Sequence, residues 1–456
     1  MASDLIAALA TAGGRSAIGV IRLSGPGAPQ CVEGLFAPAD GKPLTAHEPG
    51  RLIYGALRDR EGRLLDQVLC TWSKAPHSYT GEDTAELQCH GSPMVLSLAL
   101  EALFADGARQ AGPGEFTRRA FLNGKLDLTK AEAVMDLIDA ETPAGARTAA
   151  GQLSGALSRR GEALYSDLLD VMAHFHAVLD YPDEDLDPFT AEVLKDSLTK
   201  ARQGLADLLS THKRGQVLAR GVPTAIVGRP NVGKSTLLNA LVGYERAIVT
   251  DIPGTTRDTV EETCVLGGVL LRLMDTAGVR ETADPVEKLG VERSQRAMEQ
   301  AGLILAVVDR SAGFTAEDLD LVRRAMDTAP TLLIYNKADL PPALSPMPMI
   351  ALPDSAALSA KTGEGLDKLG ELVAKLFPNR EVGEGEALLT NARQAEAVSR
   401  AKTGVERALS ALENGVTPDA LLTDVEEALS ALGELTGKTV REDITGRIFE
   451  RFCVGK

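Results

Sequence analysis

A glycine-rich loop between an apolar run and a helical pattern constrains the fold of this chain more than any other feature. The loop reads GRPNVGKS, Gly228–Ser235, and matches the pattern GxxxxGK[ST]. It follows the apolar run TAIV and precedes TLLNALV, the strand, loop and helix order that the pattern requires. Its glycines let backbone N–H groups turn toward phosphates, and the helix N-terminus favours negative charge. We therefore expect a phosphate-binding loop in an α/β domain, with Lys234 contacting the β- and γ-phosphates and Ser235 binding Mg²⁺.

Further motifs predict that the nucleotide base is guanine. Asp275 follows the apolar run VLLRLM and fits the aspartate that reaches the Mg²⁺ shell. The NKAD stretch, 336–339, follows the run TLLIY, and a carboxylate at Asp339 can accept from both N1–H and the exocyclic amine of guanine. Adenine lacks that pair of donors, so the carboxylate would be left unpaired. The residues expected around GTP are Asn231, Val232, Gly233, Lys234, Ser235, Thr236, Thr250, Asp251, Ile252, Pro253, Gly254, Thr255, Thr256, Asp275, Thr276, Ala277, Gly278, Asn336, Lys337, Asp339, Ser359, Ala360 and Lys361.

The stretch DTAGVRE, 275–281, leaves the activation of the attacking water unexplained. Val279 occupies the place where Ras-like GTPases carry a glutamine that orients this water. If the chain hydrolyses GTP, another residue must take over that role.

The regions on either side of this unit have different sequence patterns. Residues 1 to about 115 contain short apolar runs broken by glycine, proline and charge, which is typical of mixed β structure and turns. Helical stripes with alternating spacings of three and four then follow. Their members are Leu157, Gly161, Leu164, Leu168, Val171, Phe175 and Val178 in the first stripe, and Leu422, Val425, Leu429 and Leu432 near the C-terminus.

An α/β unit between two helical stretches indicates a domain inserted into a helical one. We expect a multidomain α/β and α fold with three parts: a mixed α+β N-terminal domain over 1–118, a split helical domain over 119–218 and 380–456, and an inserted Ras-like P-loop G domain over 219–379. A chain of 456 residues is long enough for such a division.

Composition excludes some classes of function. The net charge of −16 is the wrong sign for a protein that coats nucleic acid over its whole surface, although a local basic patch remains compatible with an RNA partner. The 5 cysteines lack CxxC spacing, which argues against a disulfide framework or a zinc site. No apolar run reaches the roughly 18 residues of a membrane span. These features predict a cytoplasmic protein without a membrane partner.

The motifs GTTRD and DTAGVRE resemble those of the translational GTPases related to Era and Der. The stretch GEFTRRAFLNGKLDLTKAEAVMDLI and the ending FCVGK, 452–456, are similar to the tRNA modification GTPases called MnmE or TrmE, and this likeness covers essentially the whole chain. The resemblance implies a folate-binding-type N-terminal domain that also dimerises, a split helical domain and an inserted G domain. It also implies GTP hydrolysis coupled to the modification of wobble uridine (position 34) at C5 in certain tRNAs.

The resemblance implies how hydrolysis is activated. In this family two G domains dimerise across their nucleotide faces, and a potassium ion supplies the charge that an arginine finger supplies elsewhere. Asn231 matches the potassium ligand of the phosphate loop, and Thr256 with Ser235 matches the magnesium ligands. The loop that completes the cation site is matched at Thr250, Ile252 and Thr255.

For water activation, the position that matches the catalytic glutamate of the family is Glu287, in DPVEKLG. Without the family, Glu287 would be interpreted as a solvated carboxylate at a helix start. Glu281 is closer to DTAG in the sequence and is the alternative.

The resemblance also implies a one-carbon site. Arg22, Glu86, Lys125 and Lys456 match the positions that contact 5-formyltetrahydrofolate or a related tetrahydrofolate, with Glu82 as an alternative to Glu86. Cys453 lies in the terminal CVGK and is a candidate functional thiol. The implied partners are a second copy of the chain, tRNA, and the FAD protein MnmG (GidA), which together with this family adds an aminomethyl or carboxymethylaminomethyl group.

Two other functions fit part of the sequence. A GTP-gated ribosome-assembly factor of the Era or Der kind would carry an appended RNA-binding domain or a second G domain, and the sequence shows neither motif set. A free-standing one-carbon transferase with a regulatory G domain is the other possibility. Folate binding separates the family function from the first, and dependence on a flavoprotein separates it from the second.

Overall fold

A computed structural model describes residues 4–180, 191–244, 262–274, 295–343, 352–378, 383, 385–414, 418–439, 448–450 and 452–456. The chain divides into two compact units. Unit 1 contains residues 1–135, 161–186 and 417–456, and unit 2 contains residues 136–160 and 187–416. Within the described residues, no helix combines the length and apolar character needed to cross a membrane.

Unit 1 is built on a seven-stranded sheet with the order β3-β4-β5-β6-β2-β1-β7. Its strands are antiparallel except for the β1–β7 pair. The strands are β1 (Ile6–Leu9), β2 (Ile18–Ser24), β3 (Phe36–Pro38), β4 (Ile53–Arg58), β5 (Leu64–Ser73), β6 (Thr84–His90) and β7 (Arg109–Gln110). The mixed β structure predicted for the start of the chain is thereby confirmed.

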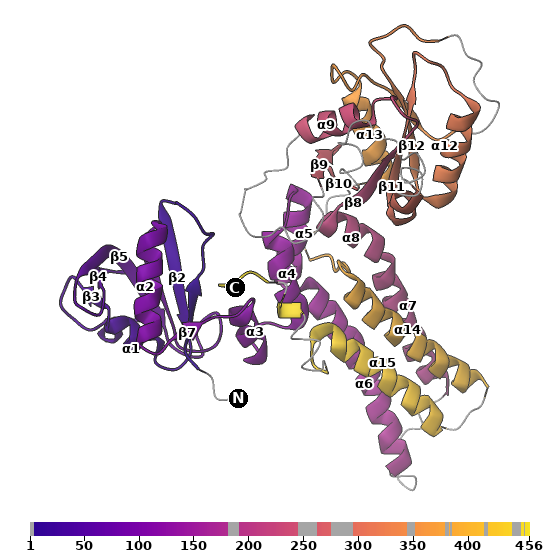
Figure 1. The fold of residues 1–456 in the computed structure, drawn as a ribbon. Helices are drawn as coiled ribbons and strands as arrows, with labels where there is room; N and C mark the ends of the chain where they lie inside the picture. The colour runs from indigo at the N-terminus through magenta and orange to yellow at the C-terminus, as the bar shows by residue number, and fades with distance from the viewer. Residues whose placement is uncertain are drawn as a thin grey trace. The chain divides into compact units, whose positions relative to one another are not determined.

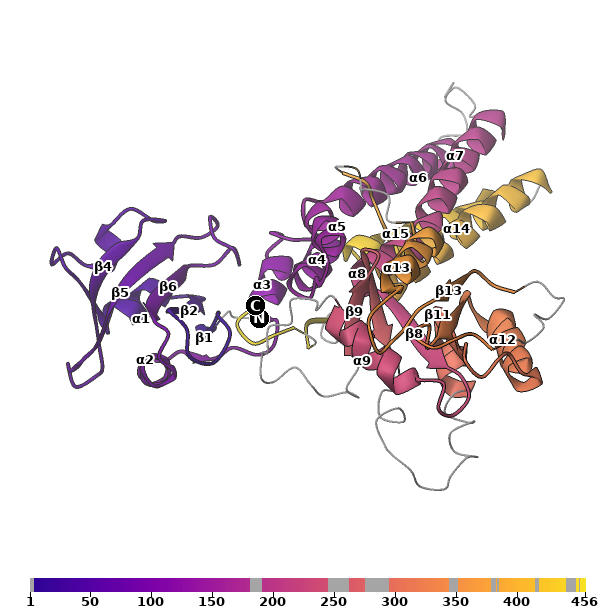
Figure 2. The same cartoon turned by 90° about the horizontal axis from the view of Figure 1, so that it is seen from above.

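One face of this sheet carries the core of unit 1. Helices α1 (Ala28–Glu33) and α2 (Pro93–Ala105) cover this face, as Figure 2 shows, and a short 3-10 turn, η1, spans Leu44–Ala46. Every second residue of β6, including Leu87 and Cys89, is buried against them. The alternate residues of β6 therefore point to the other face, because side chains alternate along a strand.

Further helices of unit 1 follow the sheet in sequence. They are α3 (Glu115–Leu122), most of α4 (Leu128–Ile138), most of α6 (Ala156–Asp180) and α15 (Pro418–Thr436). The end of α15 lies beside the start of α6, where Lys438 pairs with Glu162 at 3.5 Å, so the two helices run antiparallel. Both predicted stripes are buried where their side chains are described, as at Leu168 and Val425.

Unit 2 contains the six-stranded sheet, with the order β13-β12-β11-β8-β10-β9. All neighbours are parallel except β10 and β9. The strands are β8 (Val222–Val227), β9 (Glu262–Leu266), β10 (Val269–Leu273), β11 (Leu303–Asp309), β12 (Thr331–Asn336) and β13 (Ser355–Ala357). The runs TAIV, VLLRLM and TLLIY fall on β8, β10 and β12, and a further apolar run, LILAVV, falls on β11, because strands buried on both faces contain few polar residues.

Helices cover both faces of this sheet (Figure 1). Helices α9 (Lys234–Tyr244) and α13 (Leu366–Leu376) bury leucines on one face, and α12 (Ala316–Thr328) packs on the other. Further helices of the unit are α5 (Pro143–Leu153), α7 (Ala191–Ser210), α8 (His212–Arg220) and α14 (Ala392–Glu413). Helices α7 and α14 run antiparallel, since Lys195 at the start of α7 pairs with Glu413 at the end of α14 at 2.7 Å.

A carboxylate joins the segment before α5 to the β9–β10 hairpin within unit 2. Glu141 accepts a hydrogen bond from the Thr263 hydroxyl at 2.8 Å and one from the Arg272 guanidinium at 3.3 Å. Thr263 and Arg272 face each other across the two strands. Glu141, from the predicted helical domain, thus binds the β9–β10 hairpin of the six-stranded sheet at one cross-strand pair.

Candidate functional site

The phosphate loop connects β8 to α9 in the order that the sequence predicts. Asn231 and Gly233 adopt positive φ angles of 64° and 95°, which turn the backbone sharply before the helix begins. The ammonium group of Lys234 donates to the carbonyl oxygens of Gly228 and Arg229, both at 2.8 Å. Burial lowers the pKa of Lys234, because the charged form loses solvation. This lysine is held against the loop it belongs to.

Asn336, in the NKAD motif, links the phosphate loop to the motif Ser359–Lys361. Its side-chain amide donates to the Val232 carbonyl at 2.8 Å, and its oxygen accepts from the Ala360 N–H at 3.0 Å. The residue is 2 % exposed. A Cβ atom on Gly233 would lie 2.3 Å from the Asn336 amide nitrogen, so only glycine fits at that position. Three motifs far apart in the sequence therefore share one buried side chain.

The base-side motifs meet at the carboxyl end of β12. Lys337 donates to the Asn231 carbonyl at 3.0 Å and pairs with Asp309 at 2.6 Å. Burial alone would raise the pKa of Asp309, but hydrogen bonds from Lys337 and Ser311 outweigh it and hold that pKa below its usual value. The Ser359 hydroxyl donates to Asp339 at 2.7 Å and fixes a carboxylate that remains exposed.

The described part of the chain covers only some of the predicted nucleotide residues. Ser235, Thr236 and Lys361 are exposed, and Ser235 lies in the first turn of α9. Its hydroxyl is the kind of oxygen ligand that Mg²⁺ prefers. The predicted residues outside the described ranges are Thr250, Asp251, Ile252, Pro253, Gly254, Thr255, Thr256, Asp275, Thr276, Ala277, Gly278, Glu281 and Glu287.

A second polar cluster lies on the sheet of unit 1. Arg22 on β2 and Glu86 on β6 face each other across the ladder, and the Arg22 Nε donates to Glu86 Oε1 at 2.7 Å. The Arg22 guanidinium also lies 5.6 Å from the ring centre of Tyr79 and 5.8 Å from that of Phe116. Both charged side chains are partly exposed, at 20% for Arg22 and 30% for Glu86. We call these four residues the Arg22 cluster.

The C-terminal segment joins unit 1 next to this cluster. The Phe116 N–H donates to the Lys456 carbonyl at 3.1 Å, and the Gly114 N–H donates to the Cys453 carbonyl at 3.2 Å. Val454 forms a β-bridge with Pro113, and the Cys453 side chain is exposed. The backbone of Lys456 therefore contacts Phe116, whose ring lies beside Arg22. Lys456 and Arg22 lie near opposite ends of the sequence.

Lys125 contacts the loop that carries Tyr79. Its ammonium group donates to the Pro76 carbonyl at 2.9 Å. The two candidate carboxylates differ in their surroundings, because Glu82 is held by the Ser24 hydroxyl at 2.6 Å and by Arg119 at 3.1 Å. Glu86, in contrast, pairs with Arg22 on the exposed face.

Sequence reasoning missed the aromatic members of the Arg22 cluster. Tyr79 lies in a loop without a periodic pattern, and its hydroxyl hydrogen-bonds that of Thr117 at 3.0 Å. Phe116 lies in GEFTRRAF, a stretch that supports the family resemblance but does not indicate that an aromatic ring lies at a binding site. The sequence carried no local signal for either ring, because both lie far from Arg22 along the chain.

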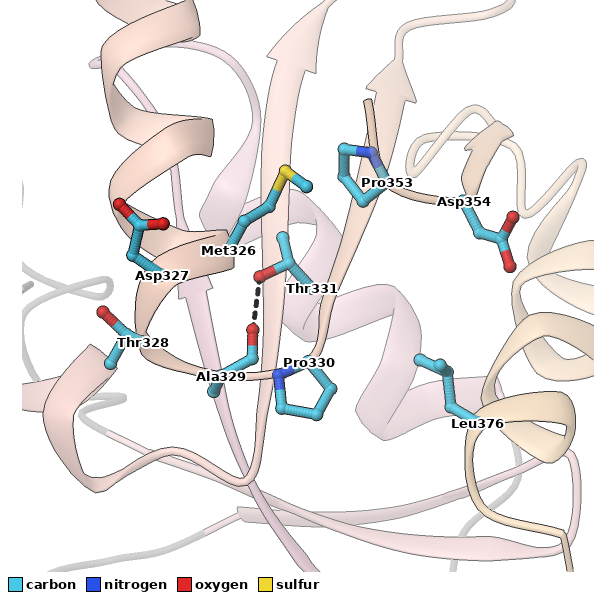
Figure 3. A pocket seen from close by; sticks show the side chains of 9 residues that line it. All are labelled: Met326, Asp327, Thr328, Ala329, Pro330, Thr331, Pro353, Asp354 and Leu376. Carbon is cyan, nitrogen blue, oxygen red and sulfur yellow. Dashed lines mark hydrogen bonds between the residues drawn. The ribbon is translucent and has the colours of Figure 1, made fainter. Parts of the chain in front are cut away.

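A shallow pocket elsewhere in unit 2 is separate from the nucleotide motifs (Figure 3). It has a volume of about 450 Å³ and is lined by Met326, Asp327, Thr328, Ala329, Pro330, Thr331, Pro353, Asp354 and Leu376. These residues surround the start of β12, whereas the nucleotide motifs gather at its end. Ligands of open parallel sheets bind at the carboxyl ends of the strands. The pocket therefore lies at the wrong end for the nucleotide.

Comparison with known proteins gives matches along nearly the whole chain. Residues 5–125 match the family model described as "GTP-binding protein TrmE N-terminus", and residues 128–453 match "MnmE helical domain". Proteins named "tRNA modification GTPase MnmE" are 42% identical in Heliobacterium modesticaldum, with 100% of both chains covered, and 46% identical in Thermus thermophilus, with 99% of both covered.

A solved structure of Era from Aquifex aeolicus is 26% identical over 40% of this chain and 65% of that chain, with a TM-score of 0.25. The family-level likeness predicted from the sequence is confirmed by the full-length relatives. The predicted fold class is confirmed as well, and GTP hydrolysis follows from the family. This chain belongs to the MnmE family of tRNA modification GTPases.

Proposed function

We propose that this chain couples GTP hydrolysis to a one-carbon transfer onto C5 of the wobble uridine of certain tRNAs, together with the FAD protein MnmG. The family makes it a GTPase of tRNA modification, and the proposal adds the donor, the position and the partner. The added group is of the aminomethyl or carboxymethylaminomethyl type. We propose that the protein acts in the cytoplasm as a homodimer.

The Arg22 cluster is the observation that carries the one-carbon half of this proposal. A reduced folate has a pterin ring system with amine and N–H donors and a glutamyl tail with carboxylates. Glu86 can accept from the pterin donors, and the rings of Tyr79 and Phe116 lie beside Arg22. The amines of Lys125 and Lys456 suit the glutamyl carboxylates. These residue types fit 5-formyltetrahydrofolate or a related tetrahydrofolate.

The nucleotide half of the proposal rests on the motifs. Asp339 reads guanine, Lys234 contacts the phosphates, and Ser235 with Thr256 holds Mg²⁺, which supplies positive charge to the phosphate oxygens. The potassium ligands would be Asn231, Thr250, Ile252 and Thr255, where a monovalent cation offsets charge on the phosphates. We keep the three-domain division 1–118, 119–218 with 380–456, and 219–379 as part of this proposal.

We assign the activation of water to Glu287, which leaves Val279 free of that role. Changing Glu287 to Ala should lower kcat for GTP by at least about 100-fold, because a general base contributes roughly 100-fold to 10,000-fold. The dissociation constant for GTP should change by less than about twofold. Single-turnover hydrolysis and fluorescent-nucleotide titration measure the two quantities. If Glu281→Ala gives this result and Glu287→Ala does not, the assignment moves to Glu281.

Potassium dependence tests the activation mechanism separately. GTP turnover by the full-length protein should be at least about tenfold faster in KCl than in NaCl at equal ionic strength, since removing one stabilising charge from such a site costs this much or more. Equal rates in the two salts would contradict the cation proposal while leaving the guanine site intact.

The experiment that tests the whole function is mass spectrometry of wobble nucleosides from cells that lack this protein. Complementation with the normal chain should restore the modified uridine, and complementation with Glu86→Gln should restore it only in part. Normal levels with Glu86→Gln and also with Glu82→Gln would remove the folate donor from the proposal.

A further inference from the structure

The phosphate loop is tethered to helix α12 by an ion pair that the loop motif does not require. Arg229 occupies the second position of GRPNVGKS, where the motif accepts any residue. Its Nε donates to Asp318 Oδ1 at 2.7 Å, across 89 residues of sequence. The Asp318 side chain is 0% exposed and that of Arg229 is 27% exposed. A carboxylate buried to this degree is costly unless a cation and hydrogen-bond donors compensate for it.

The same Asp318 carboxylate also caps the N-terminus of helix α12. Its Oδ2 accepts from the Thr315 N–H at 2.9 Å and from the Thr315 hydroxyl at 2.8 Å, and the Asp318 N–H donates back to that hydroxyl at 3.3 Å. This reciprocal arrangement is a capping box. One oxygen of Asp318 thus fixes the helix and the other holds Arg229, which makes α12 a rigid anchor for the loop.

The tether reaches the phosphate-binding lysine through the backbone. Lys234 donates to the carbonyl oxygens of Gly228 and Arg229. The loop has little freedom at Gly228, where a Cβ atom would lie 2.4 Å from the Val307 carbonyl of β11. The side chain of Arg229 therefore fixes the peptide whose carbonyl holds the Lys234 ammonium group.

We propose that Arg229 and Asp318 are a positioning pair for GTP binding, which holds the phosphate loop and Lys234 in the arrangement that receives the phosphates. Arg229 acts through the loop backbone and Lys234. The pattern GxxxxGK[ST] does not specify Arg229, so this ion pair is a contact beyond those that the motif requires.

The test measures GTP affinity and thermal stability of the full-length protein side by side. Arg229→Gln should weaken GTP binding about tenfold, and Arg229→Lys should recover part of the loss because it keeps the charge but not the planar fork. Thr315→Ala, which removes a cap donor from the same carboxylate, should lower the Tm by a few degrees and leave GTP affinity within about twofold. Glu317→Gln, an exposed acid in the same turn, controls for net charge.

A double-mutant cycle separates positioning from direct contact. In an Asp318→Asn background, Arg229→Gln should cost clearly less affinity than it does in the normal chain, because the two residues form one unit. Fully additive losses would mean that Arg229 acts independently of Asp318, and would overturn the proposal. Unchanged affinity in Arg229→Gln, or an equal loss in Thr315→Ala or Glu317→Gln, would overturn it too.

Discussion

The nucleotide site and the Arg22 cluster are held together by different kinds of contact. In the nucleotide site, Lys234, Asn336 and Lys337 all donate to backbone carbonyls of the phosphate loop. In the Arg22 cluster the contacts join side chains to one another, through an ion pair and two rings. Backbone carbonyls are present whatever the sequence, so the first site depends on backbone shape and the second on the identity of single side chains.

The largest effect should come from a change in backbone shape at the nucleotide site. Gly233→Ala places a Cβ where the Asn336 amide lies and forces a left-handed φ on a residue that disfavours it. We expect GTP affinity to fall by more than about 100-fold, because Asn336 must leave both of its partners. Titration with a fluorescent GTP analogue measures this.

The matched control is Gly243→Ala in α9, where a Cβ meets nothing within 4 Å. That variant should bind GTP normally and be slightly more stable, since alanine favours helices. Normal GTP binding by Gly233→Ala would show that side chains, as in the Arg22 cluster, dominate the nucleotide site too.

The next largest effect concerns Asp339, the side chain that we propose recognises the base. Asp339→Asn replaces an acceptor with a donor, so GTP affinity should fall on the order of 100-fold while xanthosine triphosphate, with an oxygen in place of the exocyclic amine, gains affinity. Competition between the two nucleotides on the same protein gives the ratio. A loss of both nucleotides together would indicate that Asp339 supports the Ser359 loop and does not read the base.

A smaller effect is expected in the Arg22 cluster. Glu86→Gln should weaken binding of 5-formyltetrahydrofolate about tenfold, the loss expected for one charge-assisted hydrogen bond. GTP turnover should stay within about twofold, since the two sites share no residue among those described. Isothermal titration calorimetry with the folate and a GTPase assay separate the outcomes. A parallel loss in Glu82→Gln with none in Glu86→Gln would transfer the role to Glu82.

The different construction of the two sites also explains how far the sequence could predict them. The strands β8, β10 and β12 follow from apolar runs, and the motifs after β8 and β12 follow from short patterns, because the groups that meet lie at the carboxyl ends of strands in one parallel sheet. The sequence could not predict the Arg229–Asp318 pair, which joins two positions that no nucleotide motif specifies. It could not place Tyr79 or the C-terminal segment either, since their contacts depend on loops without periodicity.

The smallest effect is the response of unit 1 to acid. Hydrogen bonds from Arg109 lower the pKa of Asp4 to about 2. Burial on its own raises the pKa of Glu115, but Arg109, the Gly112 N–H and Arg119 together bring it to about 2. Both pKa values lie below their ordinary values of 3.8 and 4.5, so the stabilisation is complete above those values and is lost as pH falls toward 2.

Trp72 provides the measurement, because it is buried in the sheet of unit 1 and is the 1 tryptophan of the chain. Its fluorescence should report falling denaturant stability between about pH 4.5 and pH 2, and Glu115→Gln should make that slope shallower. The exposed Glu101→Gln should leave the slope unchanged. An equally steep slope in Glu115→Gln would place the acid sensitivity elsewhere.

The pairing of the C-terminal segment with the N-terminal part of unit 1 has a consequence for biosynthesis. The bridge between Pro113 and Val454 and the hydrogen bond from Phe116 to Lys456 join the earliest part of the chain to residues that the ribosome adds long afterwards. Unit 1 therefore cannot be completed until the helices and the six-stranded sheet of unit 2 have been translated. A message cut short near its 3′ end would yield a chain that keeps its nucleotide motifs but leaves that first-made unit unfinished.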